Sequence, residues 1–277
     1  MSRWSGNPIW GGRMRVELRP ASVGLVRRGL FARWNTRSQH EIQVENGSAD
    51  DPSETWRAAV DALSVVLREP PARVEIVLSD HFVRYVLIPW SAELVTDPER
   101  LGFARMAFRD LYGPLADGWE LCLDEQPAGH AAFACAVDRA LVSSLRDVVG
   151  RAGGHLVALV PSLSDCINRH RSALRARDFC LVSAEPGRVS LAFHSRSGWQ
   201  AVRSRRTDGP LADALPTLLK QEMAVGDVTE SGVLYVYTDE APGGLPLTVP
   251  GWRVIRLGER GISKATRREP QMVVARG

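Results

Sequence analysis

Two stretches of sequence, VELRPASVGL at residues 16–25 and VSAEPGRVSL at residues 182–191, decide the fold. Each consists of an apolar strand, a turn that contains proline and a second apolar strand. The two stretches agree at four positions, where Val16, Pro20, Val23 and Leu25 correspond in order to Val182, Pro186, Val189 and Leu191. This internal similarity predicts a duplicated α/β unit, with two lobes that each start with a β-hairpin and meet at a cleft.

The hydrophobic pattern places the remaining elements. Apolar residues recur at three- and four-residue spacing over 53–68, which predicts a helix with Ser53 as its N-cap. Apolar runs at 74–78 and 82–90 predict two strands, joined by a polar surface turn that contains Asp80 and His81. Further helices are expected at 98–112, 138–152, 162–175 and 211–223, and further strands at 119–123, 131–137, 156–160, 179–182, 189–193, 199–203, 233–237 and 252–257.

The composition excludes several classes of protein. The chain has 277 residues, 44% of them hydrophobic, and a net charge of +3, so it can bury a core and is not a disordered tail. No apolar run approaches the ~20 residues that span a bilayer, and residues 1–12 lack the apolar stretch of a signal peptide. The four cysteines form no CxxC pair, so we expect free thiols in a reducing compartment. Together these features predict a soluble, cytoplasmic protein.

The order of elements divides the chain into four parts. We expect an N-terminal extension at 1–13 and a first lobe at 14–160, with an insertion at about 96–137. A second, smaller lobe then follows at 161–260 and a basic tail at 261–277.

The two hairpin turns lack the groups that hold a nucleotide. Such turns need backbone N–H donors and glycine near the phosphates, and a carboxylate that holds Mg²⁺ through water. Arg19 and Pro20 stand where small residues are wanted, and Ser183 takes the place of a metal-holding acid. Glu185 adds a negative charge where a phosphate would sit. We therefore predict a degenerate nucleotide cleft, formed by Glu17, Arg19, Pro20, Ser22, Ser183, Glu185 and Pro186.

Other kinds of site have weaker support. Residual binding of Mg-ATP remains an alternative. In it, the Glu17 carboxylate holds Mg²⁺ and Arg19 contacts a phosphate. No Gly-x-Ser-x-Gly elbow or ordered Ser, His and Asp set predicts a hydrolase. Cys166 and His170 share a helix face but have no second pair of metal ligands near them in sequence. A two-metal nuclease needs several clustered carboxylates, and only Glu17 is placed for that role.

The hairpins and two later segments carry a resemblance to a known family. Residues 16–26 resemble the opening hairpin of PilM, the actin-like protein of type IV pilus assembly, and of its relatives MshI and the cytoplasmic part of GspL in type II secretion. Residues 74–90 resemble the second hairpin of that family, and residues 131–163 its strand, helix, Ala-Gly turn and buried strand. The likeness covers about 14–260 as an order of elements. It implies a two-lobed actin-like (ribonuclease H-like) α/β fold with mixed sheets and a reduced second lobe.

The resemblance also implies a function. The nucleotide-binding members have an Asp-x-Gly turn in each lobe, whereas this chain has ELR at 17–19 and SAE at 183–185. We therefore expect a non-catalytic cytoplasmic scaffold, peripheral at the inner membrane, in a pilus or secretion assembly platform. Its implied partners are the cytoplasmic tail of a single-span membrane protein, gripped near the insertion at 96–137, and a secretion-type ATPase. No cofactor, metal or specific nucleic acid is expected.

Two alternative functions remain open at this point. One is an ATP-binding actin-like switch in the same machinery. The other is a protein that binds anionic surfaces or nucleic acid, through the basic tail and the arginines at 203, 205 and 206.

Overall fold

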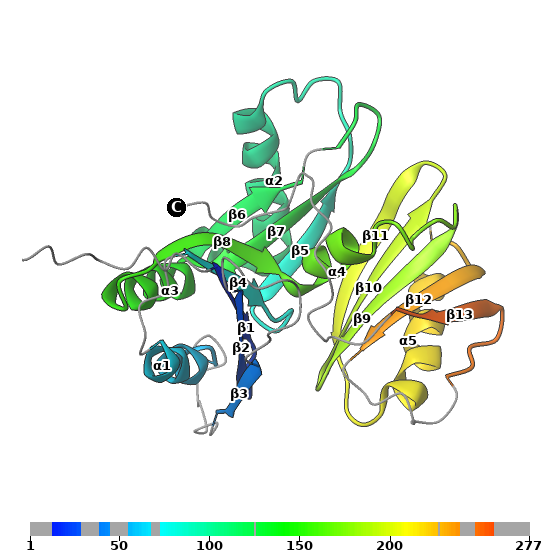
Figure 1. Cartoon of the computed structure of the whole chain (residues 1–277). Coiled ribbons are helices and arrows are strands. Elements are labelled where there is room, and N and C mark those ends of the chain that lie inside the picture. Colours follow the sequence, from blue (N-terminus) through cyan, green and yellow to red (C-terminus); the bar gives the residue numbers. More distant parts are fainter. Residues whose placement is uncertain are drawn as a thin grey trace, which may run out of the picture. The chain divides into compact units, whose positions relative to one another are not determined.

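The computed structural model describes residues 13–28, 39–44, 55–67, 73–124, 126–226, 228–238 and 247–257 (Figure 1). Groups of one to three strands are separated by helices, which confirms the predicted α/β class with mixed sheets. The described residues form two compact units. One comprises those within 13–77 and 140–159, and the other comprises those within 78–139 and 160–257. The predicted tail at 261–277, residues 1–12 of the predicted extension at 1–13, and Ser53 lie outside the described residues.

The first sheet has the strand order β3-β2-β1-β4-β8. Its strands are β1 (Arg13–Leu18), β2 (Ser22–Arg28), β3 (Gln39–Gln43), β4 (Arg73–Leu78) and β8 (His155–Pro161). The helices of this part of the chain are α1 (Arg57–Val66) and α3 (Arg139–Arg151). Helix α1 begins after Trp56, whose side chain makes no capping hydrogen bond. Helix α3 buries Leu141, Leu145 and Val148, the apolar stripe that the sequence pattern predicts.

The second sheet repeats this arrangement with the order β11-β10-β9-β12-β13. Its strands are β9 (Phe179–Glu185), β10 (Arg188–Ser195), β11 (Gly198–Arg206), β12 (Gly232–Thr238) and β13 (Trp252–Arg256). The hairpins also share their register, because Val16 lies opposite Leu25 in the first and Val182 lies opposite Leu191 in the second. The duplication inferred from four matched residues therefore extends to strand order and pairing.

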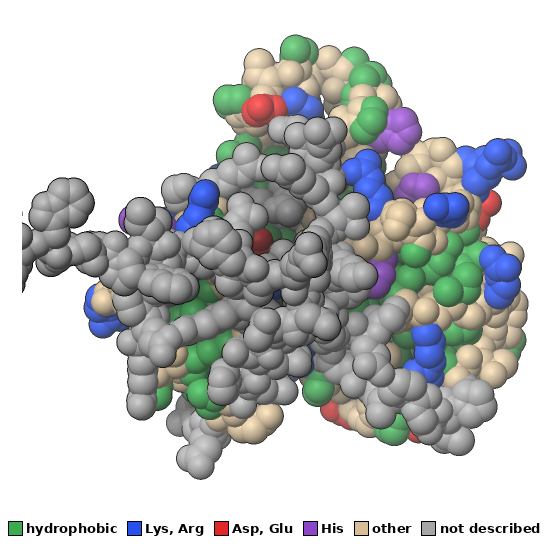
Figure 2. Space-filling view, viewed as in Figure 1, with side chains coloured by type: hydrophobic (Ala, Val, Ile, Leu, Met, Phe, Trp, Pro, Cys, Tyr) green, Lys and Arg blue, Asp and Glu red, His purple; other side chains and the backbone are tan. Residues whose placement is uncertain are grey.

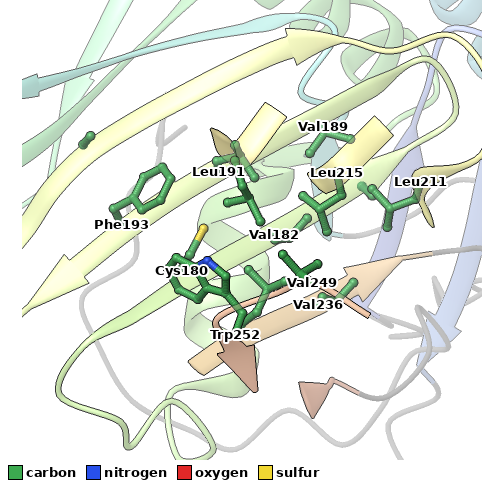
Figure 3. Close-up of a cluster of buried hydrophobic side chains, with 14 residues drawn as sticks. Cys180, Val182, Val189, Leu191, Phe193, Leu211, Leu215, Val236, Val249 and Trp252 are labelled. Atoms are coloured by element: carbon green, nitrogen blue, oxygen red, sulfur yellow. The ribbon is translucent and has the colours of Figure 1, made fainter. Parts of the chain in front are cut away.

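A hydrophobic core covers one face of the second sheet. Helix α5 (Leu211–Val225) packs Leu211, Leu215 and Leu219 against buried side chains of the strands, among them Leu191 and Phe193 (Figure 3). Glu222 of the same helix is buried and forms ion pairs at 3.3 Å with Arg203 Nε and 2.7 Å with Arg205 Nη2.

These two ion pairs bear on the alternative in which the arginines of β11 contact nucleic acid or an anionic surface. Arg203 and Arg205 neutralise a buried carboxylate, so they serve the packing of α5 on β11. This engagement weakens the case for them as contacts to nucleic acid or an anionic surface.

A third, three-stranded sheet has the order β5-β7-β6. It contains β5 (Val83–Ile88), β6 (Trp119–Leu123) and β7 (Ala132–Asp138), and it packs against α2 (Asp97–Tyr112) and the 3₁₀ helix η2 (Gly113–Gly118). Thr96 caps α2 in a capping box with Glu99. Phe108 is fully buried, with its ring centroid 6.3 Å from Tyr112 and 6.1 Å from Trp119. The predicted insertion at 96–137 thus contains α2, η2, β6 and most of β7.

Two expectations about neighbouring elements were wrong. Strands β4 and β5 do not form a hairpin, because β4 lies in the first sheet and β5 pairs with β7 in the third. Helix α4 (Ser162–His170) ends five residues before the predicted end, where the N–H groups of Ala173 and Leu174 both bond to the carbonyl of His170 and form a turn.

Candidate functional site

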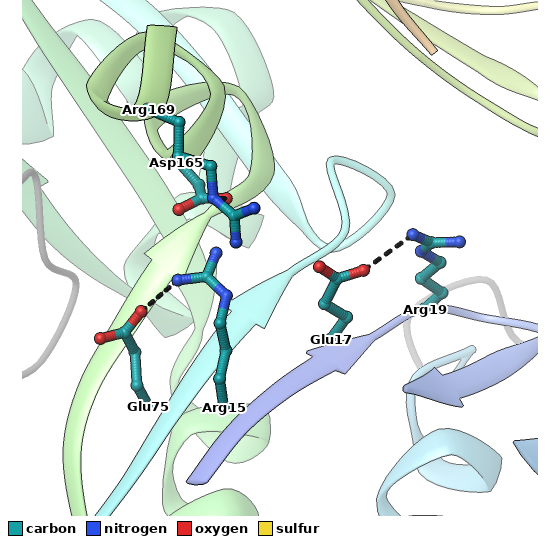
Figure 4. Close-up of polar contacts among 6 residues, drawn as sticks. All are labelled: Arg15, Glu17, Arg19, Glu75, Asp165 and Arg169. Carbon is teal, nitrogen blue, oxygen red and sulfur yellow. Dashed lines mark hydrogen bonds and ion pairs between the residues drawn. The ribbon is translucent and has the colours of Figure 1, made fainter. Parts of the chain in front are cut away.

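In the first hairpin turn, Glu17 and Arg19 form an ion pair with one another. These are the two charged side chains that the sequence suggests as ligands of a nucleotide. Arg19 Nη2 lies 2.9 Å from Glu17 Oε2, and both side chains are mostly buried (Figure 4). The backbone N–H of Arg19 donates to the carbonyl of Ser22 at 3.0 Å, which closes the turn around Pro20. Glu17 and Arg19 therefore neutralise one another, and neither presents an isolated charge.

The second hairpin turn directs its acidic group into the protein. Glu185 is 6% exposed and accepts a hydrogen bond from the Ser79 hydroxyl. The carbonyl oxygen of Pro186 lies 2.9 Å from His81 Nε2, and burial lowers the pKa of that histidine. Ser183 is buried in the sheet opposite Ser190 on β10. None of these groups replaces the N–H donors that a phosphate requires.

Asp80 joins Glu185 to form an acidic pair. Asp80 is 1% exposed, and its Oδ1 accepts hydrogen bonds from the Tyr85 hydroxyl at 2.6 Å and from the N–H of Leu163 at 3.2 Å. Burial, and then the charge of Glu185, raise the pKa of Asp80 to about 6. The prediction that this carboxylate lies in a surface turn was wrong, because Tyr85 and α4 enclose it.

Arg188 offsets part of the negative charge of Asp80 and Glu185. Arg188, which faces Glu185 across the turn, is buried and donates from Nη1 to the Ser204 hydroxyl at 3.1 Å. Burial lowers the pKa of Arg188, while the charges of Asp80 and Glu185 act against that shift. The sequence offered no local signal for this cluster, since its members come from 79–85, α4 and the second hairpin.

Two findings concern metal ligands and membrane-spanning helices in the described part of the chain. No group of three or more His, Cys, Asp or Glu side chains within it is arranged to hold a metal ion. Cys166 is buried and His170 has its pKa lowered by burial, so their shared helix face serves packing. Among the described helices, none has the length and apolar character to cross a membrane.

A cavity of about 300 Å³, which we call the groove, is lined by residues of the predicted insertion and of the segment that precedes it. Its lining comes from the end of β5 and the segment after it, the start of α2, the edge strand β6 and the β6–β7 connection, and it includes Trp90, Leu94, Leu101, Leu121, Leu123 and His130. Trp90 is 50% exposed. Further exposed apolar side chains follow on and near α2, at Val95, Met106, Leu111 and Leu115.

Figure 2 shows hydrophobic side chains with few charged ones in the upper part of the view, where Figure 1 places α2. An exposed aromatic side chain that lines a cavity, as Trp90 does here, is typical of binding sites on proteins. The groove is therefore the best candidate for a binding site.

The cysteines provide a chemical test of the groove. Cys122 lines it and is half-buried, whereas Cys135, Cys166 and Cys180 are fully buried. Burial raises the pKa of the Cys180 thiol, which further disfavours its thiolate. We expect N-ethylmaleimide to add to Cys122 alone in the native protein, as one adduct in a peptide mass map. Modification of Cys135 at the same rate would show that the β6–β7 sheet is not packed as described.

Comparisons with known proteins identify the fold. No family model matches the sequence, and no curated protein matches it. The structure has a TM-score of 0.54 to the cytoplasmic domain of EpsL, an inner membrane component of the type II secretion system of Vibrio cholerae, at 11% identity over 89% of this chain and 90% of that one. It has a TM-score of 0.56 to a Bacteroides thetaiotaomicron protein with an actin-like ATPase fold and unknown function, at 10% identity over 87% of each chain.

A third similar structure is the PilM–PilN type IV pilus biogenesis complex, with a TM-score of 0.54 and 15% identity over 82% of this chain and 81% of that one. These similarities confirm the actin-like fold expected from the sequence. The chain therefore has an actin-like fold of the kind found in the cytoplasmic domain of EpsL and in the PilM–PilN complex.

Proposed function

We propose that this protein is a non-catalytic cytoplasmic scaffold, peripheral at the inner membrane, in an assembly platform of the type IV pilus or type II secretion kind. In this proposal, the groove binds the cytoplasmic tail of a single-span membrane partner. The groove is the observation that carries the proposal, since it combines exposed apolar side chains with a strand at the edge of a sheet. The actin-like fold shared with EpsL and the PilM–PilN complex supports this setting.

The mode of binding follows from the lining of the groove. Strand β6 is at one edge of the third sheet, and side chains of β6 and of the segment after β5 form apolar walls. An extended peptide binds such a site by pairing with the edge strand and placing alternate side chains in the pockets. We expect an apolar tail segment of the partner, with Trp90 as a central contact because large exposed aromatics dominate interfaces.

The turn chemistry favours a scaffold over an ATP-binding switch. The acidic pair of Asp80 and Glu185 places two carboxyl groups at the second hairpin, and Pro186 has no N–H to donate. Carboxylate oxygens accept hydrogen bonds but donate none, and their negative charge opposes the charge of a phosphate. The proposal therefore includes a second hairpin that does not hold a nucleotide.

A labelled-peptide titration tests the groove. The probes are fluorescein-labelled peptides that cover the cytoplasmic tails of single-span inner-membrane proteins from the same organism. For the peptide that binds, we expect Trp90→Ser to raise the dissociation constant at least tenfold, measured by anisotropy, because the truncation removes ~1.4 kcal/mol or more of contact. Val225→Ser is the matched control, since Val225 is 75% exposed on α5 and does not line the groove.

Trp90→Ser and Val225→Ser together show whether the peptide binds at the groove. Binding that is weakened by Trp90→Ser and unchanged by Val225→Ser supports the groove. Equal affinities of the parent and Trp90→Ser, or no binding by any tail peptide at micromolar protein, would refute it.

A further inference from the structure

A second cavity of about 300 Å³ lies beside the groove. Asp124 and Gln126 line both cavities, so the β6–β7 connection is the wall that they share. His130 on this connection lines the groove and also lies against Gly198, where an added Cβ would come 3.0 Å from His130 Cδ2. Gly198 directly precedes Trp199, which lines the second cavity. The two cavities are thus neighbours within one compact unit of the chain.

Aromatic rings form one wall of the second cavity. The ring of Trp199 lies edge-on to three others, with centroid distances of 4.8 Å to Phe133, 5.0 Å to His194 and 5.8 Å to Phe179. Phe179 and His194 stack at 4.7 Å. Phe133 and Phe179 are buried, so this wall is fixed by the core beneath it. Such a wall favours another flat ring, because aromatic pairs gain energy beyond the area that they bury.

Polar and charged groups, Arg171 among them, also line the cavity. Asn168 from α4 lines the cavity, as do Asp124 and Gln126, and Gln126 Nε2 donates a hydrogen bond to Asp124 Oδ2. The rim segment at Ala176 is held in place, because the N–H groups of residues 175 and 176 both lie 3.3 Å from the hydroxyl oxygen of Tyr235. The cavity therefore has a rigid apolar wall and side-chain oxygens that accept hydrogen bonds.

We propose that the second cavity takes up a tryptophan or tyrosine side chain of the partner segment that occupies the groove. The inference rests on the proposed function, since Asp124 and Gln126 line both cavities and the proposal requires one extended segment to occupy both. A ring with an N–H or O–H donor satisfies both surfaces, because its face meets the aromatic wall and its donor meets the oxygens of the rim. Such anchors, buried in a pocket, carry a large share of interface energy.

The preference of the second cavity for an aromatic ring with a hydrogen-bond donor can be tested without the partner protein. The probe is N-acetyl-tryptophanamide, compared with N-acetyl-phenylalaninamide and N-acetyl-leucinamide in ligand-observed saturation-transfer NMR. We expect binding in about the millimolar range for the tryptophan probe, in line with the affinity of small ligands, and at least fivefold weaker binding for the leucine probe.

Substitutions at the rim provide matched controls. Ala176→Leu places a larger side chain at the cavity, whereas Ala173→Leu adds the same side chain three residues earlier, at an exposed position that does not line it. We expect Ala176→Leu to abolish the saturation transfer and Ala173→Leu to retain it. Asn168→Phe fills the cavity from α4 and should act like Ala176→Leu, which covers the case in which one filling variant does not fold.

The peptide found in the groove assay completes the test. Replacement of its aromatic residue by alanine should weaken binding to the parent at least tenfold, and should have little further effect on Ala176→Leu, as expected for two changes that remove one contact. Equal binding of the leucine probe, or transfer that survives both filling variants, would overturn the proposal. So would additive effects of the peptide substitution and Ala176→Leu. Because Trp90 lies outside this cavity, failure of the groove assay is distinguishable from failure of the pocket.

Discussion

An Asp80→Asn variant should be more stable than the parent by roughly 2 kcal/mol at pH 7.5, from the raised pKa of this carboxyl group. The pKa of Asp80 lies at about 6 in the folded protein, above its ordinary value of 3.8. An acid with a raised pKa stabilises the fold fully below its unfolded pKa, and this contribution is lost as pH rises through 6. Asparagine keeps an oxygen that accepts from Tyr85 and the N–H of Leu163, and it removes the repulsion with Glu185.

Thermal unfolding across pH 4 to 8 measures this effect. The melting temperature of Asp80→Asn should exceed that of the parent by about 5 °C at pH 7.5, and the difference should vanish near pH 4. His81 and His170, whose pKa values are lowered by burial, destabilise the parent and the variant alike as pH falls. The informative quantity is therefore the difference between the two proteins at each pH.

The control is Asp110→Asn, which removes an exposed carboxylate on α2 and should change stability by less than about 0.5 kcal/mol. If Asp80→Asn lowers the melting temperature at pH 7.5, Asp80 does not lie in a buried acidic pair.

Phe108→Ala should destabilise the unit that contains α2 by about 3–5 kcal/mol, the usual cost of truncating a buried phenylalanine. Phe108 is fully buried and packs against Tyr112 and Trp119, so its loss leaves a cavity between α2 and β6. Because both elements line the groove, we expect peptide binding to weaken together with the stability of this unit.

Urea unfolding followed by tryptophan fluorescence gives the stability, and anisotropy of the labelled peptide gives the binding. Met106→Ala on the same helix is the control, because Met106 is 53% exposed and its truncation should cost less than about 0.5 kcal/mol. Unchanged stability of Phe108→Ala would contradict the packing of α2 on the third sheet.

The two hairpins show why the fold could be predicted from the sequence. Strand pairing depends on local alternation of apolar residues, and Val16, Leu25, Val182 and Leu191 preserve that alternation and its register in both halves. The helices followed for the same reason, since α3 and α5 place apolar side chains at helical spacing.

Neither the acidic pair nor the third sheet could be predicted from local sequence patterns. A polar turn after β4 is typical of a surface hairpin, and only contacts from α4, Tyr85 and the second hairpin bury Asp80. Strand β5 leaves its neighbour in sequence and pairs with β7, about fifty residues later, which no local pattern specifies. The groove was expected near the insertion, but Trp90 and Cys122 were not singled out, because exposure depends on tertiary packing.

We propose that this chain, which has an actin-like fold, does not hold a nucleotide at its second hairpin, where Glu185 forms a buried acidic pair with Asp80 of the turn after β4. A calorimetric titration of the protein with millimolar Mg-ATP tests this proposal most directly. We expect heats equal to those of dilution, for the parent and for Asp80→Asn alike. A saturable heat with the parent protein, reproduced as a rise in melting temperature with nucleotide, would contradict it.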